Sequence, residues 1–399
     1  MIFSSAVLQL NNFAGKQYFI ICPKQPVMKI ALSVSLLFFT VYASSQSSHS
    51  HALQRSLKFP DIPGYKTMKC DFHQHTVFSD GSVWPDIRVQ EALLDGLDAI
   101  SLTEHLEYQP HKDDIPHPDR NRSYVLALKE AKDHNLIIVH GSEITRRMPP
   151  GHSNAIFIED ANKLLVDDSV AVFREAKKQN AFVFWNHPNW VSQRKDGIAT
   201  LTDMHRMLIR EQLLHGIEVV NDQTYSDEAL QIALDHNLTI MGTSDIHGLI
   251  DWDFKVPLGG HRPITLVFSK EKTAESIKEG LVNRRTVVFY KNLLIGRDEF
   301  LIPLIEESLK IKKASYIGRS DVLSVEIENS TNTEFILQNL SGFTLHNNND
   351  IVTVKPGDKN IIEVKTKTRL ADINLKFSVL SAVNAPNKHP VVSIKGKVE

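Results

Sequence analysis

From residue 69 onward, short runs of apolar, β-type residues alternate with segments in which apolar positions repeat at helical spacing. Pro85 suits the first turn of a helix and Gly96 suits the residue after its end. Eight strands alternating with helices predict an α/β fold with a parallel sheet, most economically closed into a barrel. The expected strands are 69–73, 99–103, 136–140, 154–158, 181–185, 216–220, 238–242 and 264–268, with helices within 85–95, 123–135, 169–180, 201–215 and 227–237.

Beyond about residue 311 the pattern changes to short β-type runs separated by turn residues such as Pro356-Gly357. Closely spaced short strands with regular turn signals predict an antiparallel β-sandwich. We therefore expect a barrel domain over 67–300 and a small all-β sandwich domain over 315–399. The seven expected strands of the sandwich are 322–328, 334–339, 343–346, 351–354, 361–365, 373–379 and 391–394.

A segment of a different kind lies before residue 47. Lys29 is followed by the apolar run 30–39 and then by Val41-Tyr42-Ala43, the arrangement of a secretory signal peptide. The run is shorter than the roughly 20 apolar residues of a membrane-spanning helix. We expect 1–46 to be a signal-peptide region with translation starting at Met28, and 47–66 to be a linker. The mature protein is then exported, with no stable membrane insertion; an uncleaved anchor is the alternative.

Composition narrows the classes of function. Of the 399 residues, 42% are hydrophobic, which excludes wholesale disorder. The chain has 45 Lys and Arg residues and 47 Asp and Glu residues, so it has no overall positive charge that would attract long nucleic acid. With only two cysteines, it also cannot be a fold held together by several disulfides. Histidine, by contrast, occurs 18 times, more often than Cys, Met and Tyr together. Because imidazole is the commonest metal-binding side chain, the positions of these histidines carry the most information.

Six of the histidines and three carboxylates lie at the ends of the expected strands. Most lie at carboxyl ends, where α/β barrels build their active sites. His73 and His75 point to the same side of an extended segment, because side chains alternate along a strand. Nine nitrogen and oxygen donors are too many for one tetrahedral zinc, and they favour two or three ions of Zn, Mn or Fe. The nine candidates are His73, His75, Asp80, His105, Glu143, His152, His187, Asp245 and His247.

Taken singly, these motifs also have structural interpretations. A lone His-x-His is mostly a surface or core pair, Glu143 could cap a helix, and Asp80 before Gly81 could be a turn residue. A ligand-competent residue at so many strand ends together favours a multinuclear metal site. The histidines at 111, 117, 134, 140, 205, 215, 236 and 261 lack this placement, and we expect most of them to be solvated or on helix faces.

The ordered set of motifs resembles the polymerase and histidinol phosphatase (PHP) family over about residues 68–268. The resemblance implies a distorted, TIM-like (βα)7 barrel with a two- or three-metal site that hydrolyses phosphoesters, leaving one of the eight strands outside the barrel. It implies that eight of the nine candidates are metal ligands, and that the ninth, Asp80, occupies a position where members of the family carry Asp or His. The motifs are His73-Gln74-His75-Thr76-Val77-Phe78-Ser79-Asp80-Gly81, Thr103-Glu104-His105, Gly141-Ser142-Glu143, His187-Pro188 and Ser244-Asp245-Ile246-His247.

The resulting hypothesis is a metal-dependent phosphatase that cleaves phosphate monoesters of small molecules by attack of a hydroxide bridging two ions. Glu143 is the expected bridging carboxylate, and Asp80 is either a ligand or the proton donor to the leaving group. Arg146 and Arg262 are candidates for binding phosphate, with surface solvation as the alternative. Trp185 and Trp190 flank His187 and could stack on a substrate ring, although core packing is favoured for both. Nucleotides, short nucleic-acid ends, a non-phosphate bond, or a binding protein led by the β-domain are the alternative functions.

Overall fold

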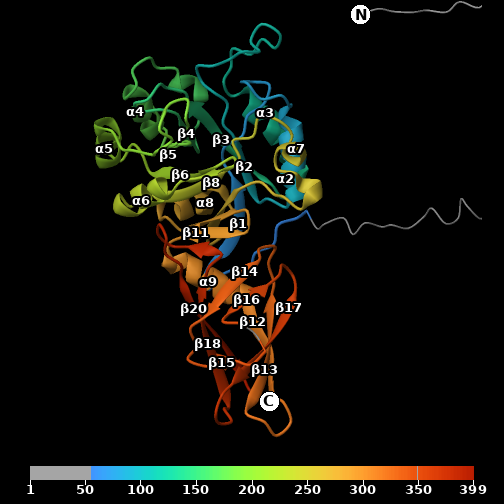
Figure 1. Cartoon of the computed structure of the whole chain (residues 1–399). Helices are drawn as coiled ribbons and strands as arrows, with labels where there is room; N and C mark the ends of the chain where they lie inside the picture. The colour runs from blue at the N-terminus through green and yellow to red at the C-terminus, as the bar shows by residue number, and fades with distance from the viewer. Residues whose placement is uncertain (1–54, 348) are drawn as a thin grey trace, which may run out of the picture. The chain divides into compact units, whose positions relative to one another are not determined.

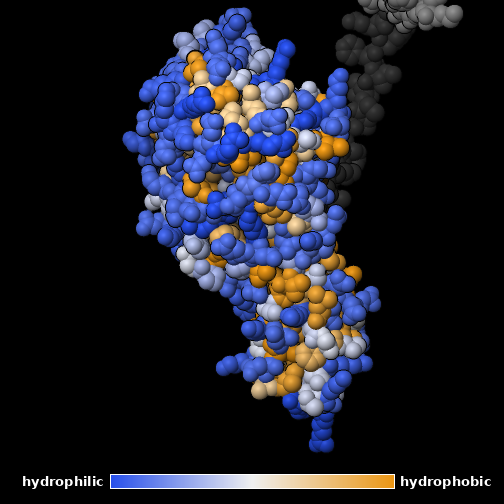
Figure 2. All heavy atoms as spheres, turned by 90° about the vertical axis from the view of Figure 1, so that its left-hand side faces the viewer, coloured by the Kyte–Doolittle hydropathy of each residue, from blue (hydrophilic) through white to orange (hydrophobic). Residues whose placement is uncertain are grey.

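The computed structural model describes residues 55–347 and 349–399, which form an α/β barrel followed by a β-sandwich (Figure 1). The expected signal-peptide region lies outside these residues. Within them, no helix has the length and apolarity needed to cross a membrane. On the face shown in Figure 2, hydrophilic residues cover most of the barrel and hydrophobic ones are interspersed, as on the exterior of most folded proteins.

Seven strands form the barrel, and each is hydrogen-bonded to the next one around it. All neighbours are parallel except β4, which is antiparallel to β3 and β5. The expectation of an all-parallel sheet is wrong at this point, because the connection between β3 and β4 is too short for a helical crossover. The strands are β1 (Lys66–Asp71), β2 (Ala99–Leu102), β3 (Ile137–Ile144), β4 (Ser153–Ile156), β5 (Phe182–Trp185), β6 (Gly216–Asn221) and β8 (Thr239–Thr243).

The barrel closes between β8 and β1 only at its mouth. Beyond the end of each strand, Gln74 forms a single parallel bridge with Ile246, and the Asp245 amide donates to the His73 carbonyl at 2.9 Å. Along the rest of its length β1 pairs antiparallel with β9 (Ile264–Ser269), which lies outside the ring of seven. This confirms the distorted barrel with one expected strand left over. It also brings residues 73–75 and 244–247 side by side.

Helices cover the outside of the barrel and follow most of its strands, except α8 (Ala274–Val282), whose Ile277 and Leu281 pack against inward-facing strand residues such as Val139. The first, α2 (Pro85–Asp95), begins with the expected proline and ends at Gly96, whose φ of 68° is left-handed. The others are α3 (Arg122–Glu130), α4 (Ala171–Lys178), α5 (Asp203–Arg210), α6 (Asp227–Asp235) and the short α7 (Ile250–Asp253), with 3-10 turns at η1 (Ala131–Asp133), η2 (Ala161–Leu164) and η3 (Val256–Leu258).

The C-terminal domain is an antiparallel sandwich of two four-stranded sheets, as expected. One additional strand, β12, precedes the expected boundary at residue 315. A bulge between Ile311 and Lys313 breaks the alternation by which a sequence reveals a strand. One sheet contains β12 (Leu309–Tyr316), β13 (Val322–Asn329), β17 (Lys359–Lys365) and β15 (Thr344–Leu345); the other contains β16 (Ile351–Val354), β14 (Phe335–Asn339), β18 (Asp372–Val379) and β20 (Val391–Lys397).

A hairpin and a helix connect the barrel to the sandwich. The hairpin consists of β10 (Thr286–Tyr290), which pairs with β9, and β11 (Leu293–Gly296); α9 (Asp298–Ser308) follows it. From the sandwich side, β19 (Ala382–Val383) pairs with β11. Phe289, Leu301 and Phe377 belong to one continuous hydrophobic cluster. The two domains therefore share a buried core.

A buried ion-pair network lies behind the mouth of the barrel. Arg262 is only 1% exposed, and its Nε lies 2.8 Å from Asp95 at the end of α2 while Nη1 lies 3.2 Å from Asp71 at the end of β1. Asp71 in turn accepts hydrogen bonds from the hydroxyl and the amide of Ser244, just after β8. One guanidinium thus connects α2, β1 and the segment after β8.

We expect Arg262→Met to lower the free energy of unfolding by about 3–5 kcal/mol, because it leaves the fully buried Asp71 without its cation, while Asp95 keeps its ion pair with Arg55. Denaturant titration followed by circular dichroism measures this change. Arg206→Met, which removes an exposed pair with Asp203, is the matched control and should leave the unfolding midpoint unchanged. A loss below about 1 kcal/mol for Arg262→Met would mean that the network contributes little to holding the barrel closed.

Candidate metal centre

All nine candidate ligands lie together at the mouth of the barrel. Each comes from a strand end or the loop beside it, and they face one another across the mouth although up to 174 positions separate them in the chain, from His73 to His247. His73, His75 and Glu143 are fully buried, whereas His247 is partly exposed. The nine residues that were grouped from the sequence therefore lie close together in space. The distances between their donor atoms divide them into three overlapping sets.

The first set contains the donors with the most regular spacing. The Nε2 atoms of His73 and His75 lie 3.1 Å apart, and each lies 3.1 Å from Oδ1 of Asp245. Two donors held at about 2.0–2.2 Å from one ion are separated by about 3 Å, so this triangle has the dimensions of a metal-binding face. Oε2 of Glu143 lies 3.8 and 3.6 Å from the same two histidine nitrogens.

Glu143 connects this set to a second one. Its Oε2 lies 2.6 Å from Nδ1 of His105, while Oε1 lies 2.9 Å from Nδ1 of His152 and 3.7 Å from Nε2 of His187. The two oxygens of one carboxylate therefore face different imidazoles. This is the arrangement that a carboxylate bridging two ions requires.

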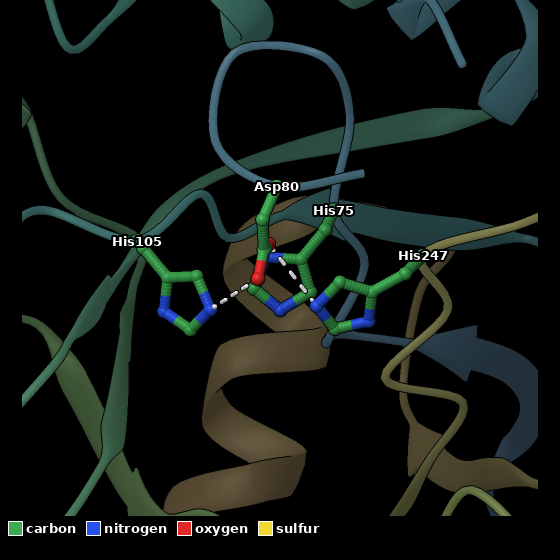
Figure 3. A group of neighbouring side chains, drawn as sticks. All are labelled: His75, Asp80, His105 and His247. Atoms are coloured by element: carbon green, nitrogen blue, oxygen red, sulfur yellow. Dashed lines mark ion pairs between the residues drawn. The ribbon is translucent and has the colours of Figure 1, made fainter. Parts of the chain in front are cut away.

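The third set surrounds Asp80, whose side chain enters the cluster from the loop after β1 (Figure 3). Oδ1 lies 3.1 Å from Nε2 of His247, and Oδ2 lies 3.4 Å from Nε2 of His105. His75 is the fourth member, with Nδ1 3.7 Å from Oδ1. Because His75 and His105 also belong to the other sets, the three sets form one connected cluster able to hold several ions.

Buried polar atoms without hydrogen-bond partners provide the test of whether metal ions fit here. Among the described residues, Oδ1 of Asp80, Oε2 of Glu143 and the Nδ1 atoms of His152 and His187 are buried and form no hydrogen bond of acceptable geometry, although the first three lie within 3.1 Å of an ionisable group. Folded proteins rarely leave such atoms unsatisfied, and an ion is one of the few explanations. The donor set of imidazole and carboxylate, with no thiolate, suits Zn, Mn or Fe.

The electrostatics of the cluster follow from burial and from the alternation of imidazole and carboxylate. Burial favours the neutral acid, yet the imidazoles of His105 and His152 hold the pKa of Glu143 well below its usual range. Burial lowers the pKa of His105, but Glu143 and Asp80 outweigh it and raise that pKa to about 11. Burial together with His247 and His105 lowers the pKa of His75 to about 3. Without bound ions, protons therefore serve as the positive charge of the site.

Glu218, in the middle of β6, is a functional residue that the sequence reasoning missed. It is buried, its Oε1 lies 2.8 Å from Nδ1 of His73, and its Oε2 accepts a hydrogen bond from the His187 amide at 2.6 Å. A carboxylate that binds Nδ1 orients the ring and leaves Nε2 free for a metal. The available signal was a charged residue within an otherwise apolar strand.

Two features hold the loop that carries Asp80. Glu104 is buried and accepts hydrogen bonds from the hydroxyls of Thr76, at 2.5 Å, and Ser79, at 2.6 Å. Gly81 lies so close to the loop that a Cβ there would approach the His75 backbone to 2.6 Å. Glu104 therefore supports the site through Thr76 and Ser79 and does not belong to the donor cluster.

The backbone is strained at two of the candidate ligands. Asp245 has a φ of 49° and His187 a φ of 28°, both in the left-handed region that residues with a Cβ rarely adopt. Such conformations persist where the surrounding structure enforces them, and they concentrate at functional sites. Here they turn the chain sharply just after β8 and β5, so that both side chains point into the mouth.

A cavity of about 500 Å³ adjoins the cluster, a size suited to a small molecule. Trp190 is 43% exposed, lines this cavity and lies 5.0 Å from the His187 ring, so the expectation that it packs in the core is wrong. Trp185 is buried and stacks on His205 instead. The lining residues are Asp80, His105, His152, His187, Asn189, Trp190, Val191, Gly197, Asn221, Asp222, Thr224, Asp245 and His247.

Neither candidate arginine contacts this cavity. Arg262 is wrong as a phosphate-binding residue, because its guanidinium is buried against Asp71 and Asp95. Arg146 does not line the cavity, and its Nη2 pairs with Glu107 at 3.0 Å and also donates to the Val166 carbonyl. Proximity to Glu143 in the sequence did not translate into proximity to the cavity, since β3 ends at Ile144 and the chain turns away.

Comparisons with known proteins agree with both domains. Residues 309–395 match DUF5001, described as an Ig-like domain. The chain is similar to a two-domain protein from Bacteroides vulgatus containing a predicted PHP-like metal-dependent phosphoesterase, with 43% identity and a TM-score of 0.80 over 86% of this chain and 98% of that one. PsfC from Pseudomonas syringae is 17% identical, with a TM-score of 0.40 over 57% and 92% of the two chains.

A curated relative is matched over a short stretch only. An uncharacterized protein of Methanocaldococcus jannaschii is 34% identical over 85 residues, which cover 21% of this chain and 36% of that protein. The chain thus spans about a third of the length of that relative.

We expect loading with Zn or Mn at pH 7.5 to release at least about one proton per protein. The pKa of about 11 means that His105 is protonated without ions and must lose its proton to bind one, and the pKa of His73 is shifted in the same direction. An ordinary histidine would release only about 0.1 proton at this pH. His75, already neutral, contributes none. Calorimetry in two buffers of different ionisation enthalpy measures the release.

Apparent metal affinity should accordingly rise with pH between 7 and 9, because protons compete for the imidazole of His105 throughout that range. Glu143→Gln is the matched variant: it removes the carboxylate that raises the pKa of His105, so both the proton release and the bound metal should decrease. Binding without proton release would contradict the electrostatic account of the site.

Proposed function

This chain belongs to the family of PHP-like metal-dependent phosphoesterases, and on that premise we propose that it hydrolyses phosphate monoesters of small molecules. The observation that carries the proposal is the convergence of nine imidazole and carboxylate donors on one mouth, around the buried Glu143 and beside a cavity of small-molecule size. No other group of described residues combines metal donors with an adjoining cavity in this way.

The donor sets assign a role to each residue. His73, His75 and Asp245 would hold one ion, His105, His152 and His187 a second, and Glu143 would bridge the two. Asp80 with His247 completes the cluster toward the cavity and would serve a third ion. When bound, ions of Zn, Mn or Fe supply a hydroxide at neutral pH and neutralise the phosphoryl group.

Asp80 fits the role of a ligand better than that of a proton donor. Although burial alone would raise its pKa, His105 and His247 hold the pKa of this carboxyl well below its usual range. A carboxylate that stays ionised near neutral pH has no proton to give to a leaving group. Asp80 would therefore act as an ionised oxygen donor beside His105 and His247.

The cavity favours small monoesters over nucleic-acid ends. Channels for single-stranded nucleic acid combine cations that follow the backbone with aromatic platforms for the bases. Of the lining residues, Trp190 is the one aromatic apart from histidine, and none is Lys or Arg. The overall balance of charges, with a formal net charge of −2, points the same way.

We expect the full chain, stripped with a chelator and reloaded with Zn, Mn or Fe, to release phosphate from 4-nitrophenyl phosphate or histidinol phosphate. The double variant His73→Ala/Asp245→Ala should lower kcat/KM by about 100-fold or more, because it removes two corners of the most regular donor set. His134→Ala, at an exposed position outside the cluster, is the control. No release with any of the three metals would contradict the proposed function.

We also propose that the protein acts outside the cytoplasm, on the strength of Lys29, the apolar run 30–39 and Val41-Tyr42-Ala43. Expressed in a Gram-negative host, the chain should appear in the periplasm with its first residues removed up to about Ala43. N-terminal sequencing of that fraction checks the cleavage. Leu37→Arg, which interrupts the apolar run, should retain the protein in the cytoplasm; equal export of both forms would contradict the proposal.

A further inference from the structure

We infer that Asp222 selects substrates by the charge of the leaving group, disfavouring a second anionic group and favouring a cationic or hydrogen-bond-donating one. The inference rests on the proposed phosphomonoesterase function and adds to it the residue that discriminates among substrates. It starts from the one carboxylate of the cavity that faces no imidazole.

Asp222 occupies a tight turn at the rim of the cavity. It is the first of the two residues that connect β6 to β7 (Thr224–Tyr225), in a hairpin whose last paired residues are Asn221 and Thr224. Its backbone is left-handed, with a φ of 49°, and its amide donates to the Thr243 carbonyl at 3.2 Å. The turn therefore fixes an exposed carboxylate at the cavity wall.

The position next to Asp222 connects it to the donor cluster. Asn221 donates hydrogen bonds from its side-chain amide to Glu218 at 2.9 Å and to Asp245 at 3.2 Å. The carboxylate of Asp222 thus lies one residue away from a group that touches a candidate ligand. A substrate whose phosphate reaches the cluster places its leaving group within the electrostatic range of Asp222.

Asp222 differs from the other carboxylates of the site in having no positive partner. Asp80, Glu143 and Asp245 each lie within 4 Å of at least two imidazoles. Asp222 forms no ion pair with any described residue and belongs to none of the donor sets. Its carboxylate therefore lines the cavity without a paired cation.

The positive groups of the cavity wall, the imidazoles of His105 and His247, face Asp80 rather than Asp222. The lining contains no Lys or Arg, and the arginines of the neighbouring segments are engaged elsewhere: Arg194 donates to the Thr200 carbonyl, and Arg146 pairs with Glu107. A second phosphate or a carboxylate on the substrate would face Asp222 without a compensating cation. Discrimination of this kind operates by repelling the wrong substrate as much as by attracting the right one.

Two small phosphomonoesters of similar length test the inference. 2-Aminoethyl phosphate and phosphoglycolate carry opposite charges at the same distance from phosphorus. We expect wild type, loaded with metal at pH 7.5, to have the higher kcat/KM, or the lower inhibition constant against 4-nitrophenyl phosphate, for the amine. Asp222→Asn should reduce the amine-to-carboxylate ratio by about threefold, the effect of removing one exposed, solvent-screened charge. Raising the salt concentration should reduce the wild-type ratio in the same direction.

Asparagine adopts left-handed φ values readily, and Asp222→Gly provides a second variant that tolerates the turn without any side chain. Asp203→Asn removes the same charge from the exposed start of α5 and should leave the ratio unchanged. An unchanged ratio in both Asp222 variants overturns the inference while phosphate release upholds the proposed function. No release from any of the three compounds overturns the proposed function, and the inference with it.

Discussion

A fully buried carboxylate, that of Glu143, is the constraint on which the organisation of the mouth depends. Burying an ionised carboxylate costs several kcal/mol unless positive charge lies beside it. The chain meets this demand with imidazoles from four neighbouring strand ends, which are cationic when protonated and become neutral donors when metal ions replace the protons. The same arrangement therefore explains both the unusual pKa values and the metal-binding geometry.

The distortions of the barrel serve this convergence. His152 precedes its strand, which in a parallel barrel would place it at the opposite end from the other ligands. Because β4 runs antiparallel, its beginning lies at the mouth, and His152 reaches Glu143. Closing β8 against β1 only beyond their ends similarly lets Asp245 sit within 3.1 Å of both His73 and His75. A regular barrel would hold these residues further apart.

The donors could be predicted from the sequence, whereas the residues that orient them could not. His73 and His75 follow from strand alternation and position, and the same holds for Asp245 and His247. Glu218 and Arg262 act through contacts with residues far away in the chain, and spacing does not encode such contacts. Arg262 in particular is of a residue type that commonly binds phosphate, but in the structure it forms buried ion pairs with Asp71 and Asp95 behind the mouth of the barrel. β12 was not predicted because the bulge between Ile311 and Lys313 interrupts its alternating pattern.

In the proposed function, chemistry and selectivity depend on different parts of the mouth. The metal donors sit on strand ends and on a loop that Glu104 and the close approach of Gly81 hold in place, so they have little freedom to change without loss of the cluster. Trp190 and Asp222 come instead from the segment after β5 and the turn after β6, at exposed positions. Exposed loops on a rigid scaffold tolerate substitution, whereas buried, mutually supporting ligands do not. It follows that relatives sharing the nine donors should differ most at these two segments, and that the same hydrolytic centre can serve leaving groups of different shape and charge.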